Sequence, residues 1–188
     1  MATADRTERS RPRVAAAAVL CVAFAVALTI GVYAKVHDPG LRPVFLVGFS
    51  GMLQMKVWLT TAAVVLAVLQ LATALAMWGK LPTAGLSGNQ VATLHRWSGT
   101  AAFAATTPVA LHCVWSLGFA DATPRVLVHS ICGCAFFGGY AAKMLGLRLP
   151  TLPGWALPVL GGTVFASFII VWLTSALWFF TRSGVALT

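Results

Sequence analysis

Five long apolar runs constrain this chain more than any other feature of its sequence. They cover residues 14–34, 57–78, 95–119, 125–147 and 155–180. A helix needs about 20 predominantly apolar residues to cross the hydrocarbon core of a bilayer, and each run has that length. Only 9% of the 188 residues are charged, whereas about a quarter are charged in a typical soluble domain. The sequence therefore predicts an all-α integral membrane protein, a helical bundle of five transmembrane helices.

Short polar segments flank this transmembrane domain, which we place at residues 14–180. Residues 1–13 form a basic N-terminal tail, and residues 181–188 form a short C-terminal tail. The first apolar run is longer than the hydrophobic region of a typical signal peptide, so we expect a retained first helix.

The connection between the first two spans, residues 35–56, is longer than a simple turn. Asp38-Pro39-Gly40 is a strong turn signal. The apolar stretch at 44–55 is too short to cross the membrane, so we expect it to lie at the interface, to re-enter partway or to fold over the bundle. His37 lies in the turn, where we expect it to be exposed.

The basic residues indicate an orientation and exclude a class of partner. The net charge of +9 does not predict nucleic-acid binding, because the cations are scattered at the ends of the apolar runs and form no patch. With the N-terminus inside, the inner segments hold eight Lys and Arg residues and the outer segments hold five. This bias predicts a multi-pass protein with a cytoplasmic N-terminus, an external C-terminus and membrane lipid as its surroundings. The inner set is Arg6, Arg9, Arg11, Arg13, Lys80, Arg96, Lys143 and Arg148, and the outer set is Lys35, Arg42, Lys56, Arg125 and Arg182.

Two histidines lie at matching depth in neighbouring apolar runs. His112 precedes the turn that begins at Gly118, and His129 follows the end of that turn at Pro124. At 1.5 Å per residue, both lie about 8–9 Å from the same end of two antiparallel helices. An ionisable side chain within a span is a functional candidate by default, and imidazole nitrogen suits haem iron. The pair therefore predicts axial ligation of one haem b in the outer half of the membrane.

The residues around this pair suit a macrocycle. Arg125, one turn from His129, is the expected partner of a haem propionate. Gly133, one turn beyond His129, lets a flat ring approach the backbone. Pro108, four residues before His112, loosens its helix. The aromatic side chains expected to wall the ring are Phe136, Tyr140 and Trp115.

Two further polar residues lie within or beside the spans. His95 starts the same helix as His112 and is about 25 Å from it, at the opposite membrane face. It is a candidate ligand for a second haem, although an interfacial pair with Arg96 that binds a propionate or a headgroup is the favoured interpretation. Gln70 is expected to bond across helices or, less commonly, to face a quinone.

Three stretches resemble a known class of membrane protein. They are Leu94-His95-Arg96-Trp97-Ser98-Gly99, the run from Leu111 to Phe119, and the run from Val128 through Gly133 to Lys143-Met144. They resemble the haem-b membrane cytochromes of the cytochrome b561 and ferric-reductase-like class, and residues 56–180 are similar to small actinobacterial membrane proteins of unassigned function. The resemblance implies a four-helix haem-binding core plus an N-terminal helix, with His112 and His129 as ligands and His95 as a candidate. That class usually carries two histidines on each of two helices, whereas here Lys143 stands where a second histidine would be expected, so we expect one haem.

Three functions remain open from the sequence. The leading one is electron transfer through a bis-histidine haem, as a cytochrome-b-like component that works with quinol or a partner redox protein. The second is copper or zinc handling by imidazole and thiol groups, since these ligands suit Cu(I) and Zn. The third is a structural or assembly subunit without a cofactor. The residues that the second function would use are His112, Cys113, His129 and Cys132.

Overall fold

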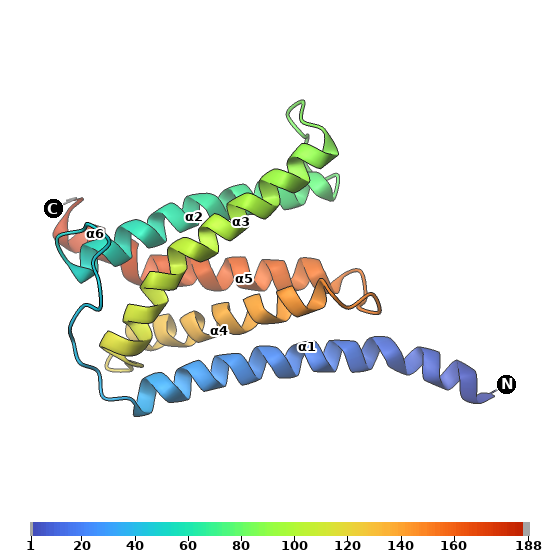
Figure 1. Cartoon of the computed structure of the whole chain (residues 1–188), viewed down its shortest axis with the longest axis horizontal. Helices are drawn as coiled ribbons and strands as arrows, with labels where there is room; N and C mark the ends of the chain where they lie inside the picture. The colour runs from blue at the N-terminus through green and yellow to red at the C-terminus, as the bar shows by residue number, and fades with distance from the viewer. Residues whose placement is uncertain (1, 186–188) are drawn as a thin grey trace. The chain divides into compact units, whose positions relative to one another are not determined.

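The protein is all-helical over the residues described, which confirms the predicted fold class (Figure 1). The computed structural model describes residues 2–185, with side chains from residue 12 onward. Five helical spans are long and apolar enough to cross a membrane, so the chain is a multi-pass membrane protein. The elements are α1 (Ala2–Val36), α2 (Met52–Met77), α3 (Gly88–Leu111), η1 (His112–Leu117), α4 (Pro124–Gly146), α5 (Ala156–Trp172), η2 (Leu173–Leu177) and α6 (Trp178–Ser183).

Several helices begin earlier than the apolar runs alone predict. The α1 backbone is helical from Ala2, so it includes most of the predicted basic tail, whose side chains up to residue 11 lie outside the description. Helix α2 begins at Met52 and takes up the end of the apolar stretch at 44–55. Helix α3 begins at Gly88 because Ser87 and Gln90 form a capping box, in which each side chain accepts the other's backbone N–H.

The chain divides into two compact units. The first contains α1, α4 and α5 as far as Val171. The second contains residues 37–118, with α2, α3 and η1, and continues from Trp172 into η2 and α6. The fifth span therefore begins in the first unit and ends in the second.

Small residues line the contact between α1 and α4 in the first unit (Figure 1). A Cβ added at Gly138 would overlap the backbone oxygen of Ala23 and would lie 3.0 Å from the Cβ of Ala27. A Cβ at Gly31 would lie 3.4 Å from the sulfur of Cys134. Such residues recur every fourth position on both helices, the spacing at which small residues let two membrane helices approach closely.

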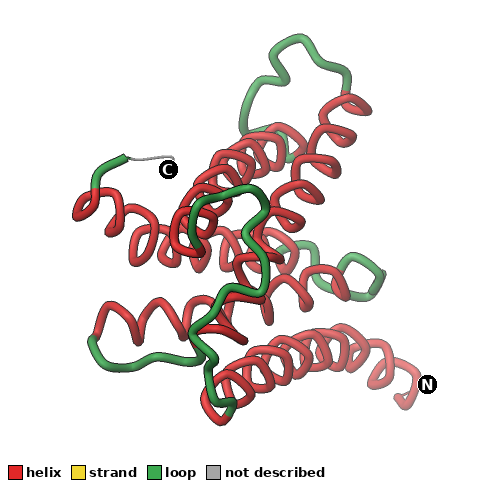
Figure 2. Tube along the Cα trace, turned by 60° about the vertical axis from the view of Figure 1, so that its left-hand side comes forward, coloured by secondary structure: helices red, strands yellow, loops and turns green. Residues whose placement is uncertain are grey.

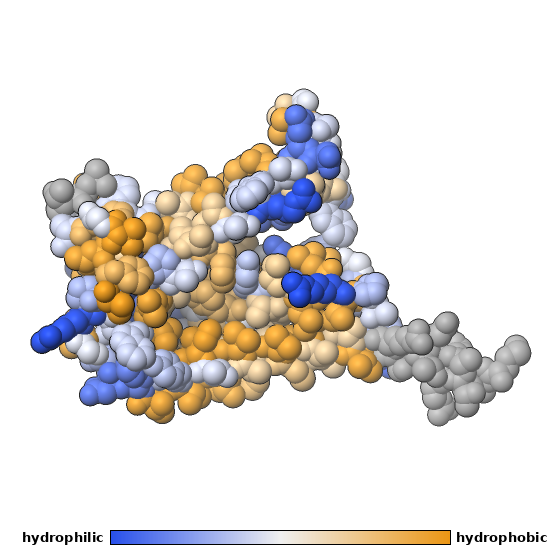
Figure 3. Space-filling model, viewed as in Figure 1, coloured by the Kyte–Doolittle hydropathy of each residue, from blue (hydrophilic) through white to orange (hydrophobic). Residues whose placement is uncertain are grey.

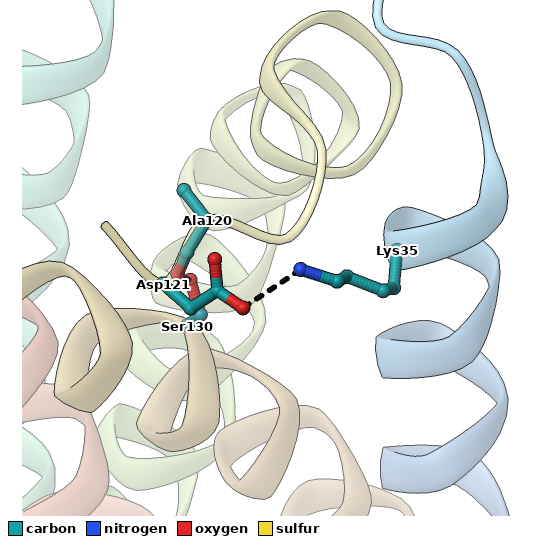
Figure 4. A network of polar contacts seen from close by, with 4 residues as sticks. All are labelled: Lys35, Ala120, Asp121 and Ser130. Carbon is teal, nitrogen blue, oxygen red and sulfur yellow. Dashed lines mark hydrogen bonds and ion pairs between the residues drawn. The ribbon is translucent and has the colours of Figure 1, made fainter. Parts of the chain in front are cut away.

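One end of the same contact carries an ion pair. Lys35 Nζ of α1 donates to Asp121 Oδ2 at 2.7 Å, and the Ser130 hydroxyl donates to the Ala120 carbonyl at 2.8 Å (Figure 4). The backbone N–H of Phe119 also donates to the Ala34 carbonyl, at 2.8 Å. These contacts fix the turn before α4 to the last turn of α1.

The Lys35–Asp121 pair predicts a small acid sensitivity. The hydrogen bond and positive charge of Lys35 lower the pKa of Asp121 below its ordinary value of 3.8. A lowered folded-state pKa means that the stabilisation is present above the unfolded-state pKa and is lost as pH falls through the folded value. The melting temperature measured in detergent should therefore decrease a little below about pH 4. This decrease should be absent in Asp121→Asn. An equal decrease in melting temperature at acidic pH in wild type and Asp121→Asn would contradict the pairing.

A polar cluster joins α2 to α3 in the second unit. Gln70 Nε2 donates to the His95 carbonyl and, at 2.7 Å, to Ser98 Oγ. Thr73 Oγ1 lies 2.9 Å from His95 Nδ1. Gln70 thus bonds across helices, the commoner of its two expected roles.

The helix surfaces remain largely apolar. Figure 3 shows hydrophobic residues along the helices and hydrophilic residues gathered toward their ends. The exposed tryptophans Trp78 and Trp155 lie directly after α2 and directly before α5, as expected for side chains at a membrane–water interface.

Candidate functional site: histidines within the spans

His112 is the most deeply buried histidine of the second unit, with no solvent-exposed surface. Its Nδ1 lies 2.7 Å from the carbonyl oxygen of Pro108. A carbonyl can only accept, so Nδ1 carries the hydrogen and the lone pair of the neutral ring is on Nε2. The carbonyl therefore fixes both the orientation and the tautomer of the ring.

The Nε2 lone pair of His112 faces the connection between α1 and α2. We call residues 37–51 the strap, because they lack regular structure and pack against η1 (Figure 2). The backbone N–H of Val44 donates to His112 Nε2 at 3.1 Å, and that of Phe45 lies at 3.5 Å. The Phe45 ring meets the imidazole edge to face, with the ring centroids 4.9 Å apart. Val44 and Phe45, from the apolar stretch at 44–55, therefore contact His112 of η1 within the second unit.

A π-helical turn, η1, presents His112 to the strap. The turn begins at His112 and ends at Gly118, whose φ of 69° suits a glycine. Pro108 precedes it by one turn and has no N–H, so the regular α-helical ladder is already interrupted there. The Ser116 carbonyl accepts the N–H of Leu41 at 3.1 Å. π-Turns within helices frequently mark functional positions.

His37 and Trp115 add a ring contact to the same junction. Their centroids lie 4.4 Å apart, and His37 is half-buried, so the expectation that it is exposed was wrong. Trp115 packs on this ring, which explains its position at the end of the span.

His129 lies on α4 in the first unit and is half-buried. Its Nδ1 is 3.3 Å from the carbonyl oxygen of Val171 on α5. Because that oxygen is also an acceptor, Nδ1 donates and Nε2 carries the lone pair. His129 and His112 therefore share the same tautomer, although they belong to different units.

The surroundings of His129 leave room beside it. A Cβ at Gly133 would meet no atom within 4 Å among the described residues. Arg125 lies one turn before His129, near the start of α4, and is half-buried. Phe136 instead packs on Phe168 with centroids 4.9 Å apart, so it belongs to the core between α4 and α5.

His95 follows the same bonding pattern on α3. The Thr73 hydroxyl has carbonyl acceptors at Leu69, 2.8 Å away, and at Gln70, 3.1 Å away. Its oxygen can therefore accept from His95 Nδ1. His95 lies near the start of α3 and His112 directly after its end, so the structure does not bring these two together.

Sequence reasoning identified the histidines but missed the strap residues that contact His112. The contacts are made by backbone N–H groups or an aromatic edge, from Leu41, Val44 and Phe45. The spacing of apolar residues in a sequence does not predict such contacts. Pro108 was the available signal, since a proline one turn before a buried polar residue often accompanies an irregular turn.

Comparison with known proteins gives a family. No curated protein and no solved structure matches the chain. The model of a family described as "Family of unknown function (DUF6529)" matches residues 15–187, which include the last four spans and all but the first three residues of the first. The chain belongs to the DUF6529 family.

Proposed function

We propose that this protein binds one haem b through His112 and His129 and transfers electrons within the membrane. One observation carries the proposal: His112 and His129 each direct Nδ1 at a backbone carbonyl, which leaves the lone pair of the neutral ring on Nε2. Metal-ligating histidines almost always donate their other ring N–H in this way, which fixes the ring and raises its basicity.

The residues around His129 fit a haem. Gly133 leaves space next to the helix, which a planar macrocycle needs for close approach. Arg125 is a cation one turn away, suited to a propionate. Gly133 is not needed for packing α4 against α1, since the close approach of those two helices is at Gly138.

His112 fits as the second ligand by orientation and burial. Its lone pair receives the Val44 N–H, so ligation at Nε2 replaces that hydrogen bond. A neutral intramolecular hydrogen bond contributes about 0.5–1.5 kcal/mol net, which a metal–imidazole bond can exceed. A haem with two axial imidazoles supplies one-electron transfer instead of oxygen binding.

The electron partners that suit this site are a quinol or a second redox protein. The resemblance of the segments around His95, His112 and His129 to the cytochrome b561 and ferric-reductase-like class supports this assignment. The excess of Lys and Arg on the N-terminal side supports a cytoplasmic N-terminus and an external C-terminus in a bacterial plasma membrane.

Copper or zinc handling has less support. Within the part of the chain that the structure describes, no three His, Cys, Asp or Glu side chains come together as a metal site. Two imidazoles alone are a common axial set for haem but an incomplete set for zinc, which is usually four-coordinate.

Gly133→Leu tests the haem assignment without touching a ligand. A Cβ added at Gly133 meets no described atom within 4 Å, so we expect folding in detergent to be unchanged. Haem content per chain, measured after purification from haem-supplied cells, should fall about tenfold or more, because the leucine occupies the ring's approach to α4. Equal haem content in Gly133→Leu and wild type would contradict the placement beside His129. Haem absent from wild type would favour a cofactor-free subunit.

A further inference from the structure

We infer that the strap regulates the site by competing for His112: its backbone amides occupy the nitrogen that would bind iron, so strap docking and ligation at His112 exclude each other. The inference rests on the proposed function. It concerns a contact within the second unit, between residues 37–51 and η1.

Strap docking and ligation exclude each other because a neutral imidazole has only one nitrogen lone pair that can accept a hydrogen or bind a metal. With Nδ1–H donated to Pro108, His112 has a single lone pair, on Nε2. That lone pair accepts the N–H of Val44 at 3.1 Å, with the N–H of Phe45 beside it at 3.5 Å. One lone pair cannot accept these hydrogens and coordinate a metal at the same time.

The strap is joined to η1 through backbone hydrogen bonds and ring contacts, which can break without unfolding the helices. These contacts include the Val44–His112 and Leu41–Ser116 hydrogen bonds and the His37–Trp115 and Phe45–His112 ring contacts. Several apolar side chains of the strap bury little surface: Leu41 is 69% exposed, Val44 52% and Val47 60%. Segments with few buried apolar contacts open at low free-energy cost.

Backbone strain also favours release. Leu41 has φ of 51° and Val47 has φ of 47°, a region that costs energy for non-glycine residues and most of all for β-branched ones. Gly48, at φ of 81°, lies next to Val47 and offers a place to bend. The contacts with η1 therefore hold the docked strap in a backbone conformation that is locally unfavourable.

Val44→Pro tests the inference, with Val44→Ala as the matched control. Proline removes the N–H that His112 accepts, whereas alanine keeps it. The imidazole lone pair attacks a carbonyl carbon of diethylpyrocarbonate, which leaves a carbethoxy group on the nitrogen and releases ethanol and CO2. The rate of this modification at each histidine, measured by mass spectrometry on haem-free protein, therefore reports whether Nε2 is available. His112 should react about tenfold faster in Val44→Pro than in Val44→Ala, and His95 should react equally in both. Phe45→Ala, which keeps both amides, is a second variant and should raise the His112 rate less.

Hemin titration completes the test. Val44→Pro should bind hemin more tightly than Val44→Ala, by about the same factor as the rate increase. Equal His112 rates in the two variants would overturn the strap contact. A faster rate with equal hemin affinity would overturn the competition while leaving haem binding intact. Hemin binding by no variant, Val44→Pro included, would overturn the proposed function and the competition with it, even where the rates differ.

Discussion

Replacing His129 with alanine should abolish the haem b spectrum and leave the protein folded. The substitution removes one proposed axial ligand. Its structural cost is small, because the side chain is half-buried and its hydrogen bond to the Val171 carbonyl is long, at 3.3 Å. We expect a loss of about 1 kcal/mol of stability, visible as a small decrease in melting temperature in detergent.

His112→Ala should abolish the same spectrum at a larger structural cost. His112 is fully buried and joins the Pro108 carbonyl to the Val44 N–H. Its removal leaves both groups without that partner and creates a cavity, so we expect a loss of about 2–4 kcal/mol. His95→Ala is the matched control, since it removes a third histidine, which contacts Thr73 near the other end of α3, and should keep the absorption. Full haem absorption in both His112→Ala and His129→Ala would contradict the ligand assignment.

Gly138→Leu should prevent stable packing of α1 against α4. Even a Cβ at this position would overlap the backbone oxygen of Ala23, and a backbone atom cannot rotate away as a side chain can. The two helices would have to separate, so we expect a loss of about 3 kcal/mol or more. The loss should appear as poor yield of monodisperse protein and a lowered melting temperature.

The neighbouring glycine supplies the control for that prediction. Gly133 is on the same helix, but a Cβ there meets no described atom within 4 Å. Gly133→Leu should therefore fold normally, even though it carries the same change in propensity and hydrophobicity. Equal destabilisation of the two variants would mean that loss of glycine from α4, and not the contact with α1, determines the effect.

The fold followed from the sequence because membrane spans are selected by length and polarity alone. An apolar run of about 20 residues has few alternatives to a helix in a bilayer, where backbone groups must bond within the segment. The helix starts were less predictable. Ser87 and Gln90 form a capping box that extends α3 back to Gly88, and this signal lies in polar residues that a search for apolar runs assigns to a loop.

The candidate residues could be proposed from the sequence, but their contacts could not. Matched distances to a short turn single out His112 and His129, and the isolated polar residue Gln70 signals a bond between helices. The strap was not predictable, because Val44 contacts His112 through a backbone N–H that every residue except proline possesses. The π-turn at 112–117 depends on contacts with the strap as well as on Pro108, so local helix propensity alone does not predict it.

A reduced-minus-oxidised difference spectrum of the purified wild-type protein tests the central claim most directly. Haem should be supplied during expression, and the pigment should be quantified against protein. We predict a b-type α-band with one haem per chain. Purified, folded protein that shows no such band would contradict the account.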